Sequence, residues 1–225
     1  MWVVPEINGE FIERMEDVLR VYARPYDPEQ PVVCLDERPV VLRDSARPDS
    51  PMRPGRPGRS DYEYVRRGTA NVFCIVEPKT GRRLTHATRR RTNRDFARAL
   101  RRIARTYRTA KRIHLVLDNL SSHSEKACIE TFGEREGRSL WARFKIHFTP
   151  KHGSWLNAAE MEASLLSRQC LGKRRIPDRS TLVREVRAWR RVATREGMPI
   201  RWKFRVKDAR RVFRYDRLRS QRSEH

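Results

Sequence analysis

The chain has 225 residues and a mass of 26.8 kDa, enough to bury the core of one large or two small domains. It carries 51 Lys and Arg against 28 Asp and Glu, a formal net charge of +23, which favours a polyanionic partner. There is no apolar run of about 18 residues and no basic region followed by an apolar one at the start, so we expect neither a membrane span nor a secretory signal.

The first third of the chain predicts a helix, a strand, a long loop and a strand pair. The helix covers 6–21 and begins at Asn8, and the apolar run at 31–37 is typical of a strand. Residues 43–68 are rich in Pro, Gly and Arg, which predicts a basic loop that contacts DNA or a second subunit. Strands follow at 70–77 and 83–88, joined by a turn.

Helices and strands alternate in the rest of the chain. The clearest helix covers 92–107, where apolar residues recur on one face and arginines on the other. Further strands are predicted at 111–119, 141–150 and 200–206 and further helices at 124–137, after Asn157 and at 178–195, with a frayed tail at 216–225. This order predicts an α/β fold with a sheet of mixed direction.

The four cysteines form no metal-binding pattern. Cys34, Cys74, Cys128 and Cys170 include no CxxC pair, and their spacing matches no zinc ribbon or finger. We expect them to be small buried side chains in a reducing compartment.

Two aspartates stand at the ends of apolar strands. Asp36 ends the run VVCLD and Asp118 ends IHLVLD, which is where open α/β sheets place their chemistry. If the two strands are neighbours, the carboxylates converge and need a cation, for which Mg²⁺ is the natural choice. Strand-end aspartates are also common as turn and cap residues. Glu37 is the alternative to Asp36, but alternation along the strand turns it to the opposite face.

A third acid, Glu160, lies in the first turn of a predicted helix. Together with Asn157 it forms an N-x-x-E pattern close to a capping box, so capping and metal binding both remain open for it. Glu162 is the neighbouring alternative, which points about 200° away around the helix.

These acidic blocks resemble a known family. The segments VVCLDE, LVLDNLSSH and TPKHGSWLNAAEMEASLL are similar to the three acidic blocks of mariner-superfamily transposases of the insertion-sequence-630 type. Further segments, YDPEQPVVCLDE, GRPGRSDYEYVRRGTANVF and LSRQCLGKRRIPDRSTL, extend the resemblance over most of the chain. The Asp-Asn-x-x-x-His and Trp-Leu-Asn-x-x-Glu patterns together are specific.

The resemblance implies a ribonuclease-H-like mixed sheet flanked by helices, and a triad of Asp36, Asp118 and Glu160. Each would be a Mg²⁺ or Mn²⁺ ligand, with two ions ~3.5–4 Å apart at the scissile phosphate. The implied reactions are DNA cleavage at transposon ends and strand transfer into target DNA, typically at TA. Asn119 and His123 match motif positions, where they would orient the site, touch DNA or simply cap the loop.

The resemblance also sets expectations for domains and partners. A helical lead-in at 1–30 precedes a catalytic domain at 31–215, which leaves no room for the family's N-terminal helix-turn-helix region. We therefore expect a split-frame product, a truncated copy, or a catalytic half with a helix-turn-helix partner. The expected assembly is a homodimer on DNA, in the cytoplasm at the nucleoid.

The positive charge is concentrated after residue 80. Residues 1–80 carry 12 basic and 14 acidic side chains, whereas residues 81–225 carry 39 and 14. Arginine and lysine clusters there could follow DNA phosphates, or be solvated surface in an Arg-rich protein. The candidates outside the 92–107 helix are Arg89, Arg90, Arg91, Lys151, Lys173, Arg174 and Arg175.

Three functions remain in competition. The leading hypothesis is a metal-dependent DNA strand-transferase. The alternatives are a basic DNA-binding remnant without activity and a related nuclease that only hydrolyses. All three acids are present, which favours an enzyme over a remnant.

Overall fold

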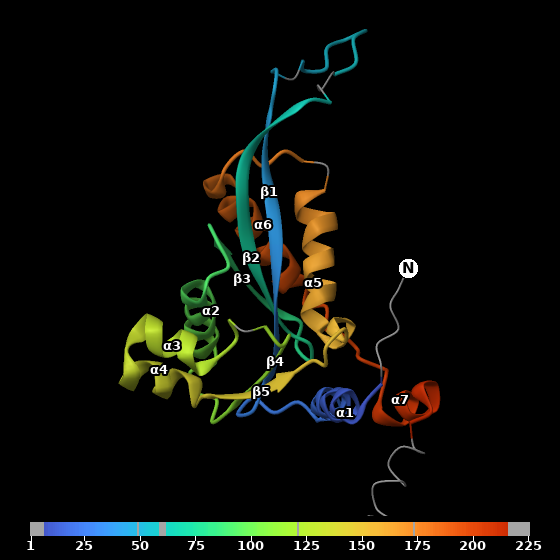
Figure 1. Ribbon diagram of the computed structural model, residues 1–225. Coiled ribbons are helices and arrows are strands. Elements are labelled where there is room, and N and C mark those ends of the chain that lie inside the picture. The colour runs from blue at the N-terminus through green and yellow to red at the C-terminus, as the bar shows by residue number, and fades with distance from the viewer. Residues whose placement is uncertain (1–6, 49, 59–61, 121, 173, 216–225) are drawn as a thin grey trace, which may run out of the picture.

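The structure, a computed structural model, describes residues 7–48, 50–58, 62–120, 122–172 and 174–215. Its centre is one five-stranded sheet in the order β3-β2-β1-β4-β5 (Figure 1). β1 pairs antiparallel with β2 and parallel with β4, while β2–β3 is antiparallel and β4–β5 parallel, so the predicted mixed sheet is confirmed. The strands are β1 Val32–Ser45, β2 Tyr64–Glu77, β3 Arg82–Thr88, β4 Ile113–Leu117 and β5 Phe144–Phe148.

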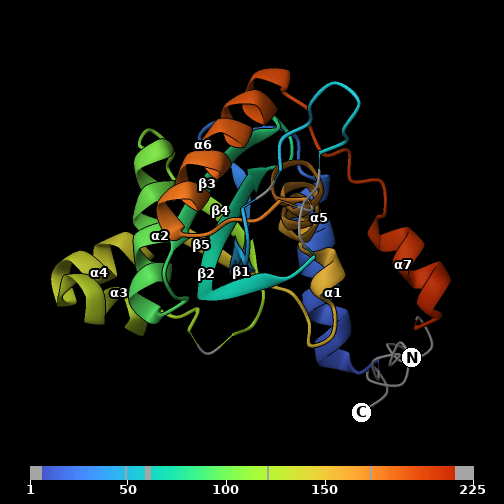
Figure 2. The ribbon, with the colours of Figure 1, turned by 90° about the horizontal axis from the view of Figure 1, so that it is seen from above.

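Helices cover both faces of the sheet (Figure 2). On one face lie α2 (Asn93–Thr106), α3 (Glu125–Phe132) and α4 (Glu134–Trp141). The other face carries α1 (Gly9–Ala23), α5 (Ala158–Leu166) and α6 (Arg179–Glu196), with α7 (Val206–Phe213) beside α1. Two short turns flank α5: the 3-10 turn η1 (Ser154–Leu156) and the π-helical turn η2 (Ser167–Leu171).

The apolar stripes predicted from the sequence form the core. The predicted stripe of α2, including Phe96, Leu100 and Ile103, is buried against the sheet, and Thr92 and Asp95 close its start as a capping box. Helices α1 and α6 are likewise capped by Asn8 and Asp178, through the side chains. The four cysteines are free and buried, as predicted.

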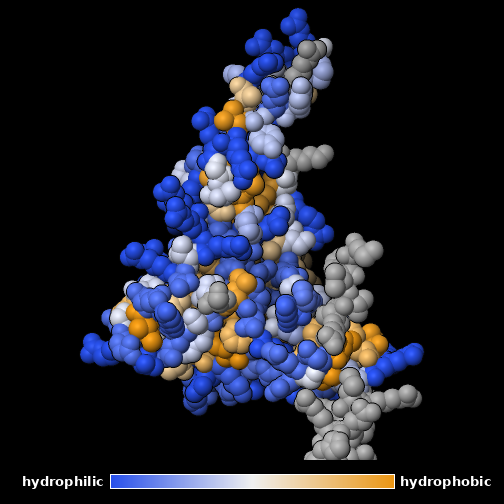
Figure 3. All heavy atoms as spheres, viewed as in Figure 1, coloured by the Kyte–Doolittle hydropathy of each residue, from blue (hydrophilic) through white to orange (hydrophobic). Residues whose placement is uncertain are grey.

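β1 is longer than predicted, and the loop at 43–68 is correspondingly shorter. β1 continues through Pro39 to Ser45, and β2 begins at Tyr64, so only residues between these strands form the loop. Proline is tolerated because β1 pairs with β4 only as far as Cys34, and beyond that point its second edge is open. The hairpin projects from the body, and its tip is mostly hydrophilic (Figures 1 and 3).

Two other expectations were wrong in detail. The predicted helix at 124–137 is two helices, because Gly133 adopts a positive φ of 84° between them. The predicted strand at 200–206 does not form. Its apolar residues instead pack on the α1 side of the sheet, where Trp202 lies against Tyr22, and α7 follows.

Lys173 and the predicted tail at 216–225 lie outside the described residues. In the part of the chain that the structure describes, no helix combines the length and apolarity needed to cross a membrane.

Candidate active site

Asp36 and Asp118 are brought together by the parallel pairing of β1 and β4. Cys34 of β1 lies opposite Val116 of β4, so two residues further along, Asp36 comes level with Asp118. Side chains alternate along a strand, which places both aspartates on the face that carries Cys34 and Val116. This is the face that α1 and the start of α5 cover. The two strands part after this pairing. β4 ends at Leu117, directly before Asp118, whereas β1 continues past Asp36 to Ser45, so the predicted strand-end position is right for Asp118 and wrong for Asp36.

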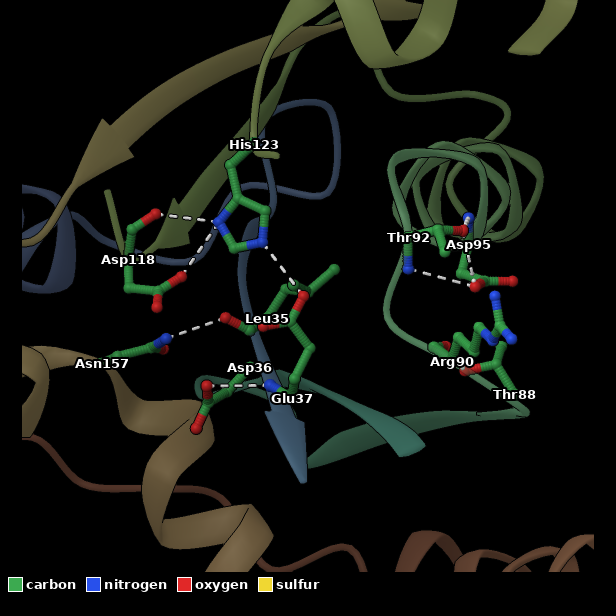
Figure 4. Close-up of polar contacts among 10 residues, drawn as sticks. All are labelled: Leu35, Asp36, Glu37, Thr88, Arg90, Thr92, Asp95, Asp118, His123 and Asn157. Carbon is green, nitrogen blue, oxygen red and sulfur yellow. Dashed lines mark hydrogen bonds and ion pairs between the residues drawn. The ribbon is translucent and has the colours of Figure 1, made fainter. Parts of the chain in front are cut away.

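Asn157 fastens the first turn of α5 to β1 beside Asp36. Its Nδ2 donates to the carbonyl oxygen of Leu35 at 2.8 Å, and its Oδ1 accepts from the Ala159 N–H at 3.1 Å (Figure 4). The Tyr22 hydroxyl strengthens the same turn, since it donates to the Leu156 carbonyl oxygen and accepts from the Ala158 N–H. The turn that carries Glu160 is therefore held against the end of the β1–β4 pairing.

Glu160 stands in this first turn with its side chain uncommitted. Asn157 caps the helix through Ala159, and the reciprocal bond of a capping box is absent from α5. Within the described ranges, neither Glu160 nor Asp36 has an ion-pair partner. Asn157 alone therefore caps α5, and metal binding is the role that stays open for Glu160.

Asp36, Asp118 and Glu160 act on one another electrostatically, although among the described residues their carboxylate oxygens do not all come within 4.8 Å of one another. Burial raises the pKa of Asp36 to about 6, and the negative charges of Asp118, Glu160 and Glu37 act in the same direction against the opposing Glu37 N–H bond. Close like charges of this kind are relieved by a cation. Carboxylate oxygens are hard ligands, so the donor set fits Mg²⁺ or Mn²⁺.

His123 is buried between two acids (Figure 4). Its Nε2 lies 3.1 Å from Glu37 Oε1, and its Nδ1 lies 2.9 Å from both the backbone oxygen and Oδ1 of Asp118. The ring also stacks on Phe96 of α2, with centroids 4.5 Å apart. Burial alone would lower the pKa of His123, but the bonds to Asp118 and Glu37 outweigh it and raise that pKa to about 10. Of the roles left open for His123, the geometry favours orienting Asp118.

Among the described residues, the one group whose potential ligand atoms all lie within 4.8 Å of one another is Glu37, Asp118 and His123, and not the predicted triad. Both nitrogens of His123 are occupied, however: Nε2 bonds to the Glu37 carboxylate and Nδ1 to the backbone oxygen of Asp118, with Asp118 Oδ1 at ion-pair distance, so the imidazole is a bridge between the two acids. A metal ligand would direct one nitrogen at the ion. Glu37 faces α2, as strand alternation predicted, and Asp118 belongs to both groups.

Glu162 is committed elsewhere. Its Oε1 accepts from Arg83 Nε at 2.9 Å, and the two side chains are only 2% and 3% exposed. Arg83 also donates to the backbone oxygens of Gly81, Ala193 and Met198, so it joins β3 to α5 and to the end of α6. Glu162 therefore belongs to the core and leaves Glu160 as the helix acid nearest the aspartates.

The predicted DNA-binding residues fall into two groups. Arg89, Arg90, Arg91 and Lys151 are exposed, as is Asn119. Arg174 pairs with Glu185 at 2.6 Å, and Arg175 donates to Ser45 Oγ at 2.9 Å. The latter two side chains thus have partners inside the molecule.

The fold is similar to that of solved transposase structures, although no curated protein has a matching sequence. The Mos1 mariner paired-end complex with Mn matches with a TM-score of 0.52 and 17% identity, covering 85% of this chain and 58% of that one. The Mos1 strand transfer complex matches with a TM-score of 0.53 and 16% identity, covering 84% and 56%. The pre-cleavage Mos1 transpososome matches with a TM-score of 0.53 and 17% identity, covering 84% of this chain and 57% of that one.

The chain therefore spans less than two thirds of the Mos1 chains it matches. The five-stranded mixed sheet with helices on both faces corresponds to the ribonuclease-H-like fold of that transposase, which confirms the predicted fold class. Residues 31–183, more than half of the chain, match the family described as DDE superfamily endonuclease. The chain belongs to the DDE superfamily endonuclease family.

Proposed function

We propose that this protein is the catalytic domain of a DNA transposase of the mariner superfamily, of the insertion-sequence-630 type, which cleaves DNA and transfers strands. The observation that carries the proposal is that Asp36, Asp118 and Glu160 lie on one face of the sheet, where β1 and β4 part and α5 begins, and that the charges of Asp118 and Glu160 help to raise the pKa of Asp36. The family match supports an endonuclease, and the Mos1 complexes support the fold.

In this proposal Asp36, Asp118 and Glu160 hold two Mg²⁺ or Mn²⁺ ions. Bound there, the ions would supply Lewis-acid charge at the scissile phosphate and acidify an attacking water or 3′-hydroxyl. The chain's own contribution is positioning. His123 holds the Asp118 carboxylate from behind, and Asn157 holds α5 against β1. His123 and Asn157 thus position the carboxylates before the substrate binds. An in-line displacement at phosphorus requires such fixed positions of the reacting groups.

The DNA would reach the site along the exposed basic residues, with Lys151 on the loop before η1 and Arg89–Arg91 at the end of β3. The proposed assembly is a homodimer on transposon-end DNA, with end recognition by a helix-turn-helix region or partner. The similar Mos1 structures are paired-end and strand transfer complexes, which supports strand transfer over hydrolysis alone.

The test is Mg²⁺-dependent nicking of supercoiled plasmid, followed by joining of a pre-cut DNA end into a target plasmid. Wild-type protein is expected to do both. Asp118→Asn should lose both while it retains DNA binding, and Glu134→Gln, on exposed α4, should behave as wild type. Nicking without joining would indicate a nuclease, and nicking by Asp118→Asn at the wild-type rate would remove Asp118 from the site.

A further inference from the structure

Two hollows that share Arg179 lie beside β3, one along its outer edge and the other past its end, next to β1 and β2. One is lined by Thr85, His86, Arg102 and Arg187 among others, and the second by Arg67, Arg89 and Arg90, and Arg179 lines both. We call this continuous feature the arginine groove and define it by its six arginines. They are Arg67, Arg89, Arg90, Arg102, Arg179 and Arg187.

The groove follows from the position of β3 at the end of the sheet. α2 packs on one face and α6 on the other, so their polar sides meet beyond the β3 edge (Figure 2). Thr85 and Ala87 face α6, whereas His86 faces the α2 side, where its ring stacks with Phe73. A free strand edge usually attracts another strand. Here that edge is flanked by arginines from both helices.

The arginines of the groove are crowded, and among the described residues one of the six pairs with an acid. Arg67 pairs with Asp44 on the exposed hairpin, but within the described ranges the other five make no ion pair. Burial lowers the pKa of Arg102, and the charges of Arg190 and Arg187 lower it further. Like charges held together in this way cost folding free energy, which an arriving anion relieves.

The groove lies close to the acidic site but apart from it. Asp36 pairs with Cys74 and Cys74 with Thr85 across the sheet, so Thr85 is two strand spacings, about 10 Å, from Asp36. A duplex whose backbone occupied the groove could therefore extend to the carboxylates. The guanidinium forks match phosphate oxygens and read no bases, so the contact would be independent of sequence.

We propose that the arginine groove binds the phosphate backbone of duplex DNA, away from the phosphate that reacts. The choice of DNA over another polyanion rests on the proposed function. The new element is the contribution of α6, through Arg179 and Arg187, which joins the α2 arginine Arg102 in one groove. These residues make the groove a positioning surface for DNA.

The test compares two triple variants of equal charge. The groove triple is Arg89→Gln, Arg179→Gln and Arg187→Gln. The control triple is Arg108→Gln, Arg112→Gln and Arg135→Gln, three exposed residues that do not line the groove. Binding to a fluorescent duplex of about 30 base pairs is measured in EDTA over a salt series. The groove triple should lose ten- to a hundredfold in affinity at moderate salt and flatten the log–log salt slope by about 2.7. The control triple should change affinity less than threefold.

Equal losses in the two triples would overturn the groove, because net charge alone would then explain binding. An RNA duplex of the same length bound more tightly than DNA, with the same loss in the groove triple, would overturn the choice of partner. The groove triple should melt at the wild-type temperature or higher. If it melts lower, Arg179→Gln alone carries the test, with an expected slope change of about 0.9. The binding assay contains no metal, so it is independent of cleavage. Weaker binding by the groove triple therefore supports the groove even if wild-type protein does not cleave DNA. If wild-type protein cleaves DNA but the groove triple binds as well as wild type, the groove is rejected and the proposed function stands.

Discussion

Asn157 Nδ2 donates a 2.8 Å hydrogen bond to the carbonyl oxygen of Leu35, the residue immediately before Asp36. That oxygen lies just beyond the last β1–β4 pair, Cys34 with Val116, so it has lost its neighbouring strand. One side chain thus replaces a missing sheet contact and also caps α5. The acid on the strand and the acid on the helix are held together by this residue.

Asn157→Ala should destabilise the protein and reduce cleavage together. Loss of the cap costs about 1 kcal/mol, and the buried Leu35 oxygen left without a donor costs about 1–3 kcal/mol more. Urea unfolding measures the loss, and plasmid nicking measures activity. Asn157→Ser, which can still cap, should recover the cap contribution and little of the activity. Full activity in Asn157→Ala would show that the bridge does not position the site.

Glu160 and Glu162 provide a matched pair of acids two residues apart. Glu160→Gln should reduce cleavage about a thousandfold, since a lost metal ligand costs several kcal/mol of transition-state stabilisation. Its free energy of unfolding should be within about 0.5 kcal/mol of the wild-type value, or higher. Glu162→Gln should cost about 3–5 kcal/mol, because Arg83 is left buried without its partner, and should keep cleavage where the protein is folded. The exchange of these two phenotypes would mean that Glu162 is the functional acid.

His114 should make the protein less stable in mild acid. Its Nδ1 lies 2.9 Å from His147 Nε2, whose ring contacts Asp17, and its own Nε2 is buried without a partner among the described residues. Burial lowers the pKa of His114 to about 4, and the charges of Arg24, His147 and Lys145 act in the same direction.

The sign follows from the lowered pKa. The unfolded chain takes up a proton at His114 as pH falls through about 6.5, whereas the folded protein resists until about pH 4, so stability declines between these values by about 2–3 kcal/mol. Asp36, whose pKa is raised to about 6, acts in the opposite direction over the same range, so the His114 contribution is measured as a difference between variants. Urea unfolding from pH 7 to 4 should lose more stability, by this amount, in wild-type protein and in His152→Gln, an exposed control, than in His114→Gln. In His114→Gln the part of the pH dependence of the free energy of unfolding that is due to His114 should be absent. The same pH dependence in His114→Gln as in wild-type protein would show that other groups cause it.

DNA affinity should depend steeply on salt. If the basic half of the chain contacts about 6–10 phosphates, affinity should fall about 10³–10⁵-fold between 50 and 200 mM salt. Titrations of a duplex at several salt concentrations, with metal chelated, measure the slope. A flat profile would contradict a phosphate-binding surface of this size.

The strands and caps that position the acids could be predicted because their signals are local. An apolar run that ends in acid predicts both β1 and β4, and Asn8, Thr92 and Asp178 precede their helices as caps. The full length of β1 could not be predicted, because Pro39 normally ends a central strand, and only the pairing partners reveal an open edge there.

The contacts that organise the site join residues far apart in the chain. Glu37 and His123 are 86 residues apart, and Arg83 and Glu162 are 79 apart, so neither pair leaves a periodic or spacing signal. The second role of Asn157, toward Leu35, is hidden behind its ordinary role as a cap. The arginine groove likewise arises only when α2 and α6 meet at the β3 edge. The assignment of Asp36, Asp118 and Glu160 as metal ligands stays a prediction.

The most direct test of that assignment is a crystal soaked with Mn²⁺ and measured at a wavelength where manganese scatters anomalously. We expect anomalous density between the carboxylates of Asp36, Asp118 and Glu160, with the His123 ring still bonded to Glu37 and Asp118. Density bound by His123, Glu37 and Asp118 instead, or no density near Asp36 at a concentration that supports nicking, would contradict it.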